Sequence, residues 1–333
     1  MRYVIIGAGA VGGTIGARLS RAGRDVTLVA RGPHLAAIRE RGLTLATPDG
    51  EYTARVPALG DPAGADPDGA PRLTPDTVLV LTVKSQDTEA ALRSWADLPV
   101  TGGGTAAERL PLLTAQNGVA NERAAARLFE RVHPVCVWLP ATHLEPGRVA
   151  ASGHPYSGML HLGRFPDGAD DTDRDIAADL AAAGFLAPVR DDVMRWKYGK
   201  LLRNLGNGVE ALFGRSGEAG LYEAVLAEGE AVLAAAGIPY TSKAEESAER
   251  GDRVAVRPVA GQERQGGSTW QSLARAAGSA ETDHLNGEIA LLGRLHGVPT
   301  PANAAVQRAV RRAVRERIPA GGYPRAELTP AHG

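Results

Sequence analysis

Cysteine and aromatic residues are scarce in this chain of 333 residues, which has one cysteine and 5% aromatic residues. A single cysteine cannot form a disulfide within the chain. Cys136 lies in the run 133–138 with apolar neighbours, so we expect a buried strand residue rather than a nucleophile. Such sparse use of cysteine fits a cytoplasmic protein.

Net charge and long apolar runs are also missing. The chain has 37 basic and 38 acidic residues, which gives a formal charge of −1. This balance argues against nucleic acid or an acidic membrane surface as a partner. Apolar runs stay well short of the roughly 18 residues typical of a membrane helix, so we expect no transmembrane helix and no signal peptide. We also expect no metal site.

Glycine, by contrast, is abundant, and its most informative cluster follows the first apolar run, 3–6. Gly7 permits a tight turn from strand to helix, Gly9 allows a pyrophosphate to approach the backbone, and Gly12 allows close helix packing. The helix N-terminus then attracts the phosphates. A tight turn without a ligand is the alternative, but the β-branched strand 25–30 further on favours a dinucleotide site. The cofactor-binding residues expected here are Gly7, Ala8, Gly9, Ala10, Val11 and Gly12.

The end of the strand 25–30 indicates which dinucleotide is bound. An NAD site usually has Asp or Glu there to bind the ribose 2′-hydroxyl. This chain has Ala30, Arg31 and Gly32 instead, and an arginine can pair with a 2′-phosphate in bidentate fashion. We therefore predict NADP(H) as cofactor, with a solvated surface arginine as the alternative.

The pattern up to residue 190 alternates between strands and helices, whereas beyond it the pattern is helical. This predicts an α/β protein with an N-terminal Rossmann-type, NADP-binding domain at 1–190 and a second, all-helical substrate and catalytic domain at 191–333. A loop is expected at 57–75 and a frayed tail at 319–333. The other expected elements are helices 33–41, 169–183, 193–204, 221–236 and 281–296, and strands 43–47, 51–56, 77–83, 110–115, 135–139, 149–152 and 158–162.

Polar residues follow two of the expected strands at the sheet edge where doubly wound folds bind ligands. Lys84 follows the strand 77–83, and Asn117 follows the strand 110–115. Solvated loops would explain both equally well. Their shared position beside the glycine turn leads us to place Lys84 near the cofactor and Asn117 near the nicotinamide.

A second group of candidates lies in the helical half. Lys200 and Asn204 are four residues apart and share one helix face. Beside Trp196 and the leucines at 201–202, the Lys200 amine would be desolvated, which would lower its pKa toward use as an acid, although a solvated surface lysine is the alternative. Glu281 and Asp283 begin a late helix, where acids are favoured whatever the function. The stretch 266–272 is rich in glycine and hydroxyl groups able to approach a carboxylate.

Taken together, these residues resemble the ketopantoate reductase (2-dehydropantoate 2-reductase) family over nearly the whole chain. The resemblance implies NADPH, a small-molecule 2-oxo acid substrate reduced in an interdomain cleft, and a place in pantothenate biosynthesis. It implies that Lys200 is the catalytic lysine, Glu281 the acid that assists it, and Thr269 a substrate contact. Lys84, Asn117 and Asn204 match further polar residues of the cleft. The stretches that carry the resemblance are Gly7–Gly12, Arg31, Val83–Lys84, Gln116–Gly118, Trp196–Asn204, Ser268–Gln271, Glu281–Gly287 and His296–Asn303.

The chain departs from the family pattern on the substrate side. In place of the family's usual Asn-Pro this chain has Asn207-Gly208, displaced by one residue and without the proline. Gly266-Gly267 replaces an amide, and Trp270 replaces a methionine. From the family resemblance, reduction of 2-dehydropantoate to pantoate is the leading expectation. A different 2-oxo acid or an imine is the first alternative, and a non-catalytic NADP-binding sensor is the second. The apolar content of the helical half also permits a homodimer.

Overall fold

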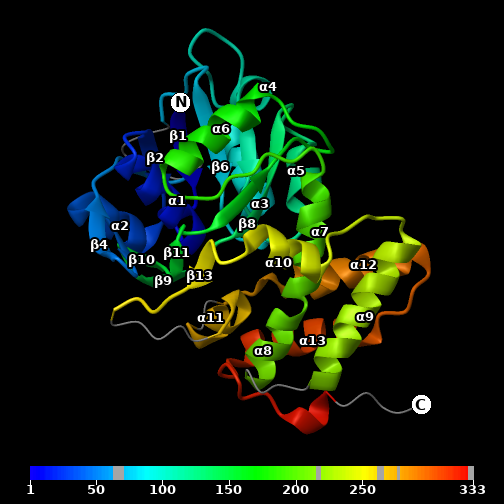
Figure 1. Ribbon diagram of the computed structural model, residues 1–333. Helices are drawn as coiled ribbons and strands as arrows, with labels where there is room; N and C mark the ends of the chain where they lie inside the picture. Colours follow the sequence, from blue (N-terminus) through cyan, green and yellow to red (C-terminus); the bar gives the residue numbers. More distant parts are fainter. Residues whose placement is uncertain (63–70, 215–218, 261–265, 276–277, 329–333) are drawn as a thin grey trace. The chain divides into compact units, whose positions relative to one another are not determined.

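The computed structural model describes residues 1–62, 71–214, 219–260, 266–275 and 278–328. The chain divides into two compact units (Figure 1). The first unit holds Met1–Gln116, Asn121–Met194 and Ala244–Glu263, and the second holds Asn117–Ala120, Arg195–Lys243 and Arg264–Gly333. Parts of the expected loop at 57–75, of the segment 250–271 and of the tail lie outside the described residues.

A parallel sheet forms the centre of the first unit, in the order β12-β8-β7-β6-β1-β2-β5. The first strand, β1, pairs in parallel with β2 on one side and with β6 on the other, so the strand order reverses beside β1. Only β12 runs antiparallel among the described strands of this sheet. The strands are β1 (Arg2–Ile6), β2 (Asp25–Val29), β5 (Ala58–Leu59), β6 (Thr77–Leu81), β7 (Leu112–Thr114), β8 (Val132–Trp138) and β12 (Met159–Leu162).

Helices cover both faces of this sheet, and successive strand residues face opposite sides. Tyr3 and Ile5 of β1 belong to a buried cluster with α1 and α6, whereas Val4 and Ile6 belong to a cluster with α3, α4 and α5. This two-sided burial explains why the strands are continuous apolar runs. The helices are α1 (Ala10–Arg21), α3 (Thr88–Ala96), α4 (Ala106–Arg109), α5 (Asn121–Ala125) and α6 (Asp171–Ala182).

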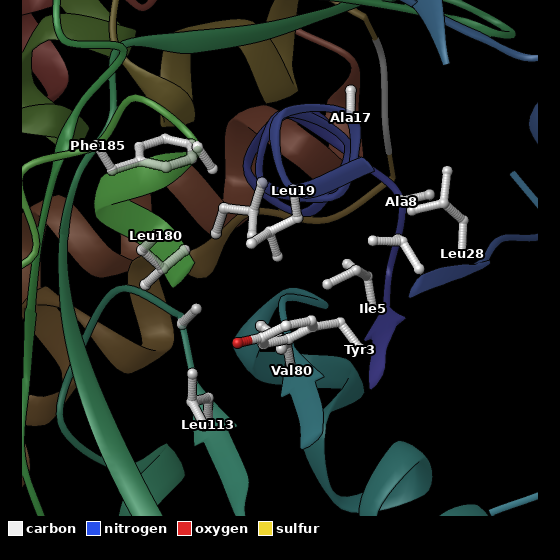
Figure 2. Close-up of a cluster of buried hydrophobic side chains, with 14 of the residues drawn as sticks. Tyr3, Ile5, Ala8, Ala17, Leu19, Leu28, Val80, Leu113, Leu180 and Phe185 are labelled. Carbon is white, nitrogen blue, oxygen red and sulfur yellow. The ribbon is translucent and has the colours of Figure 1, made fainter. Parts of the chain in front are cut away.

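One buried polar contact ties α6 to the first strand. Figure 2 shows Leu19, Leu180 and Phe185 gathered with Tyr3 in the first cluster. The Tyr3 hydroxyl donates a hydrogen bond to Asp179 Oδ2 at 2.7 Å, and Asp179 also pairs with an arginine, Arg24. Burial, together with this carboxylate, raises the pKa of Tyr3 well above its usual range. The phenol therefore stays protonated and anchors the helix.

A smaller sheet beside the main one runs in the order β4-β3-β10-β9. The sequence predicts the β3–β4 hairpin and β10 correctly, but not β9, nor the short β5 inside the expected loop at 57–75. Each of these missed strands is defined by its partner: β5 lies parallel to the end of β2, and β9 pairs with β10. The elements of this region are α2 (Gly32–Arg41), β3 (Leu43–Thr47), β4 (Gly50–Ala54), β9 (Ala141–Glu145) and β10 (Arg148–Ala151).

The second unit is built of helices. Helix α12 packs against α13 and α9, and α8 packs against α11 and α13. The described helices are α7 (Val193–Asn204), α8 (Gly206–Phe213), α9 (Ala219–Ala235), α11 (Ser268–Ala274), α12 (Asn286–His296) and α13 (Pro301–Glu316), with short 3₁₀ turns η2 (Glu281–His284) and η3 (Arg325–Glu327). Among the described residues, every helix is too short or too polar to cross a membrane.

Two expectations for the helical half are wrong in detail. The chain beyond residue 190 is not helical throughout, because α10 (Lys243–Arg250) is followed by a strand, β13 (Val254–Val256), which pairs antiparallel with β11 (Gly153–Pro155) of the first unit (Figure 1). The expected helix 281–296 is also interrupted. Leu285 leaves the helical region at φ −115° and ψ −89°, so η2 ends there and α12 begins at Asn286.

Buried amides secure α12 after this interruption. Asn286 Nδ2 donates to the Leu205 carbonyl at 3.1 Å and to Asn303 Oδ1 at 3.0 Å. Asn303 Nδ2 donates in turn to the Val225 carbonyl at 2.9 Å. Glu228 accepts the backbone N–H groups of Ala302 and Asn303 at the start of α13. These contacts join α9, α12, α13 and the connection between α7 and α8.

Candidate cofactor and catalytic sites

A cavity of about 340 Å³ opens in the first unit at the carboxyl ends of β1, β2 and β6. This is where the strand order reverses, the position at which doubly wound sheets bind their ligands. Its lining combines the glycine turn, the start of α2 and the segment after β6. Its lining includes Gly7, Ala8, Gly9, Arg31, His34, Asp61, Thr82, Lys84, Asp87 and His143.

The glycine turn is held against β6 by close backbone contacts. Gly7 has φ +107°, which side chains rarely adopt. A Cβ atom at Gly12 would meet the Gly7 carbonyl oxygen and Thr82 Oγ1 at 2.2 Å each. The Thr82 hydroxyl donates to the Gly7 carbonyl at 2.6 Å and lies 3.1 Å from that of Ile6. Sequence reasoning missed Thr82, which reads there only as a β-branched strand residue.

Gly9 has a different surrounding. It precedes α1 with φ −71°, and a Cβ atom built on it would meet open space in the described part of the chain. Backbone strain therefore does not require glycine here. The open space on this backbone, at the positive end of α1, is what a pyrophosphate needs in order to approach. The turn thus fits a dinucleotide.

The charged lining of the cavity is mixed in sign. Arg31 and Lys84 line it together with Asp61 and Asp87. The Arg31 guanidinium donates to Asp87 Oδ2 at 3.2 Å, and 71% of the arginine side chain is exposed. Arg31 and Lys84 thus line one cavity, and their contacts with a cofactor stay predictions.

His34 is a lining residue that sequence reasoning missed. Its Nε2 lies 2.7 Å from the Ala8 carbonyl oxygen, and its Nδ1 accepts the Gly147 N–H at 2.9 Å. A carbonyl can only accept and an N–H can only donate, so these partners fix a neutral ring with its hydrogen on Nε2. Burial lowers the pKa of His34 below 6.5, which agrees with this assignment. His34 thereby ties the glycine turn to the β9–β10 connection.

The second unit contains the predicted lysine. Lys200, in α7, donates a hydrogen bond to Asn117 Oδ1 at 2.9 Å. Asn117 belongs to the short segment Asn117–Ala120 that groups with the helical unit, although Gln116 before it belongs to the first unit. Gly118 lies against η2, since a Cβ atom there would meet the His284 carbonyl oxygen at 2.9 Å. Asn117 therefore bonds Lys200 and directly precedes a residue that packs against η2, the turn that begins with Glu281.

The other predicted residues of this unit differ in exposure. Asn204 ends α7 one turn after Lys200, and its Nδ2 is buried without a hydrogen-bond partner in the described residues. Glu281 opens η2 and is half-buried. Thr269 is 2% exposed within α11. The expected contacts of Glu281 with Lys200, of Thr269 with a substrate and of Asn117 with the nicotinamide stay predictions.

The doubly wound sheet and the glycine turn at its switch point define a Rossmann-type dinucleotide-binding protein with a second, helical unit. The chain matches two family models, "Ketopantoate reductase PanE/ApbA" over residues 3–167 and "Ketopantoate reductase PanE/ApbA C terminal" over residues 192–314. It belongs to the ketopantoate reductase family, a family of nicotinamide-dependent oxidoreductases. The family and the fold class inferred from sequence are thus confirmed.

Named relatives agree with this membership. The 2-dehydropantoate 2-reductase of Caulobacter vibrioides is 31% identical over 91% of this chain and 95% of its own length. That of Pyrococcus horikoshii is 30% identical over 206 residues, which cover 61% of each protein.

Two solved structures are similar over 95% of this chain and 99% of their own. A PanE/ApbA family ketopantoate reductase from Ralstonia eutropha JMP134 has a TM-score of 0.74 at 29% identity. D-mandelate dehydrogenase, solved with NADH and anilino(oxo)acetate, has a TM-score of 0.78 at 22% identity, which shows the fold alone.

Two glycine substitutions separate the structural and ligand-binding parts of the turn. Gly12→Ala should lower the free energy of unfolding by about 1–3 kcal/mol or more, because the new methyl group meets backbone and a fixed hydroxyl. Gly9→Ala should change it by less than about 0.5 kcal/mol, since the methyl enters open space. Gly9→Ala should nevertheless weaken NADPH binding. Urea unfolding without nucleotide and fluorescence titration with NADPH measure both, and full NADPH affinity in Gly9→Ala would contradict a pyrophosphate site here.

Acid should destabilise the first unit through His34. Both folded and unfolded chains hold this ring neutral well above pH 6.5, but on acidification the unfolded ring takes up a proton first, since its pKa is not lowered. The free energy of unfolding should therefore fall as the pH drops below about 6.5. His34→Gln, which can keep both hydrogen bonds without titrating, should show a smaller fall. Equal pH slopes for the two proteins between about pH 5 and 8 would contradict the assignment.

Proposed function

We propose that this chain is an NADPH-dependent reductase of a 2-oxo acid, with 2-dehydropantoate as the leading substrate and pantoate as product. The observation that carries the proposal is the hydrogen bond from Lys200 Nζ to Asn117 Oδ1 at 2.9 Å. Through this bond the Asn117 side chain, which comes from a separate part of the chain, orients the Lys200 ammonium group. The family membership supports the same reaction class.

The first unit supplies the groups suited to the dinucleotide. The backbone of Gly7, Ala8 and Gly9, with the first turn of α1 (Ala10, Val11, Gly12), would hold the pyrophosphate. Arg31 would pair with the 2′-phosphate, and Lys84 would add positive charge to the same cavity. When bound, NADPH supplies a hydride for the carbonyl carbon of the substrate.

Lys200 completes the reduction. Addition of hydride to a carbonyl carbon leaves negative charge on its oxygen, and a positioned ammonium stabilises that charge and donates the proton that gives the hydroxyl group. Asn117 accepts one of the three N–H groups of Lys200 and so orients the amine. Glu281 would assist by accepting a further hydrogen bond from Lys200 or from the substrate hydroxyl.

The substrate carboxylate requires hydrogen-bond donors, and Asn204 offers one. A buried amide nitrogen without a protein partner costs free energy unless a ligand accepts its hydrogen bond. Asn204 follows Lys200 by one helical turn, so one molecule can reach both groups. Thr269 would add a hydroxyl contact.

Substitution of the lysine tests its role. Lys200→Ala should reduce kcat by roughly 10²–10⁴-fold, because the positioned acid is lost, while the Kd for NADPH stays near that of the parent protein. Lys243→Ala removes an exposed lysine at the start of α10 and serves as the control, with kcat expected to be unchanged. A Lys200→Ala enzyme with full kcat would remove this residue from the mechanism.

A panel of 2-oxo acids with NADPH tests the substrate. 2-Dehydropantoate should give the highest kcat/KM, followed through the loss of NADPH absorbance. An aromatic 2-oxo acid belongs in the panel because of the shared fold with D-mandelate dehydrogenase. Oxidation with that acid but not with 2-dehydropantoate would select another substrate. Binding of NADPH without oxidation by any 2-oxo acid or imine would select a sensor.

A further inference from the structure

The cation that selects NADPH in the proposed function already has a partner. Arg31 Nη2 lies 3.2 Å from Asp87 Oδ2, and both side chains line the cavity at the carboxyl ends of β2 and β6. Asp87 ends the short turn η1 (Ser85–Asp87), where its N–H donates to the Lys84 carbonyl at 2.8 Å. The Asp87 carboxylate is not used to cap α3, although the residue stands at the N-cap position of that helix. It accepts instead the hydrogen bond from Arg31.

We propose that Asp87 is a specificity-determining residue, which accepts the ribose 2′-hydroxyl of NAD(H) and opposes the 2′-phosphate of NADP(H). The inference rests on the proposed dinucleotide site. Rossmann-type sites that bind NAD usually take this carboxylate from the end of the second strand, where this chain has Ala30 and Arg31. In this protein the carboxylate comes from the connection between β6 and α3 instead.

The chemistry of the two nucleotides explains the direction of the effect. A 2′-phosphate would add about −1.5 to −2 charges beside the Asp87 carboxylate and would compete with it for the Arg31 guanidinium. A 2′-hydroxyl has a hydrogen to donate and no such charge, so it can bind Asp87 while Arg31 remains paired. Arg31 therefore favours NADPH, and Asp87 reduces that preference. The wild-type protein should bind both nucleotides.

The Kd values of NADPH and NADH, measured by fluorescence titration on the full chain, test this assignment. Asp87→Asn should tighten NADPH, weaken NADH and raise the ratio Kd(NADH)/Kd(NADPH) by roughly tenfold, a moderate figure because the pair is exposed and screened. Asp87→Ser should shift the ratio in the same direction, which guards against a folding defect peculiar to one variant. Arg31→Ala should lower the ratio.

Asp61→Asn is the matched control. It removes a second carboxylate from the lining of the same cavity and leaves both members of the Arg31–Asp87 pair in place. Its ratio should stay within about twofold of the parent value, because general electrostatics act on both nucleotides and fall off with distance. A ratio unchanged in both Asp87 variants, or raised as much by Asp61→Asn, would overturn the proposal. If instead neither nucleotide binds the parent protein, or Arg31→Ala leaves the ratio unchanged, the proposed NADPH site itself fails.

Discussion

The contact between the Thr82 hydroxyl and the Gly7 carbonyl fixes the part of the molecule on which cofactor binding depends. It joins the end of β6 to the glycine turn at an oxygen–oxygen distance of 2.6 Å. At that separation the side chain at position 12 has no room, so the glycine there follows from packing rather than from chain flexibility. Gly9, in open space, keeps its backbone accessible. One turn thus combines a tightly packed side with an open side.

The two units divide the chemistry between them. The first presents a cavity whose charges are balanced in sign and whose histidine is held neutral by its partners. The second presents an amine oriented by an amide, together with an amide nitrogen that lacks a protein acceptor in the described chain. The side-chain amide nitrogens of Asn286 and Asn303 both donate hydrogen bonds within the second unit. Asn204 Nδ2 is the donor that the proposed function assigns to the substrate carboxylate.

Sequence reasoning predicted what depends on local order. The strand, glycine turn and helix at 2–21 and the helix 193–204 are set by neighbouring residues, and the structure has both. Contacts between segments far apart in the chain could not be predicted from the sequence. β13 is a three-residue run that becomes a strand through β11, and His34 reads as an ordinary polar helix residue until Gly147, 113 positions away, donates to it.

The path of the chain between the units has a practical consequence. The backbone crosses between them at Gln116–Asn117, returns at Ala120–Asn121, and crosses again near residues 194, 243 and 263. Cutting the chain once at residue 190 would therefore separate Asn117 from Lys200 and β11 from β13. Exchange of the second unit between relatives would have to carry the segments 117–120, 195–243 and 264–333 together and leave 244–263 behind. The two units consist of interleaved segments, so a chimera with a single crossover at residue 190 would take Asn117 and Lys200, and likewise β11 and β13, from different parents.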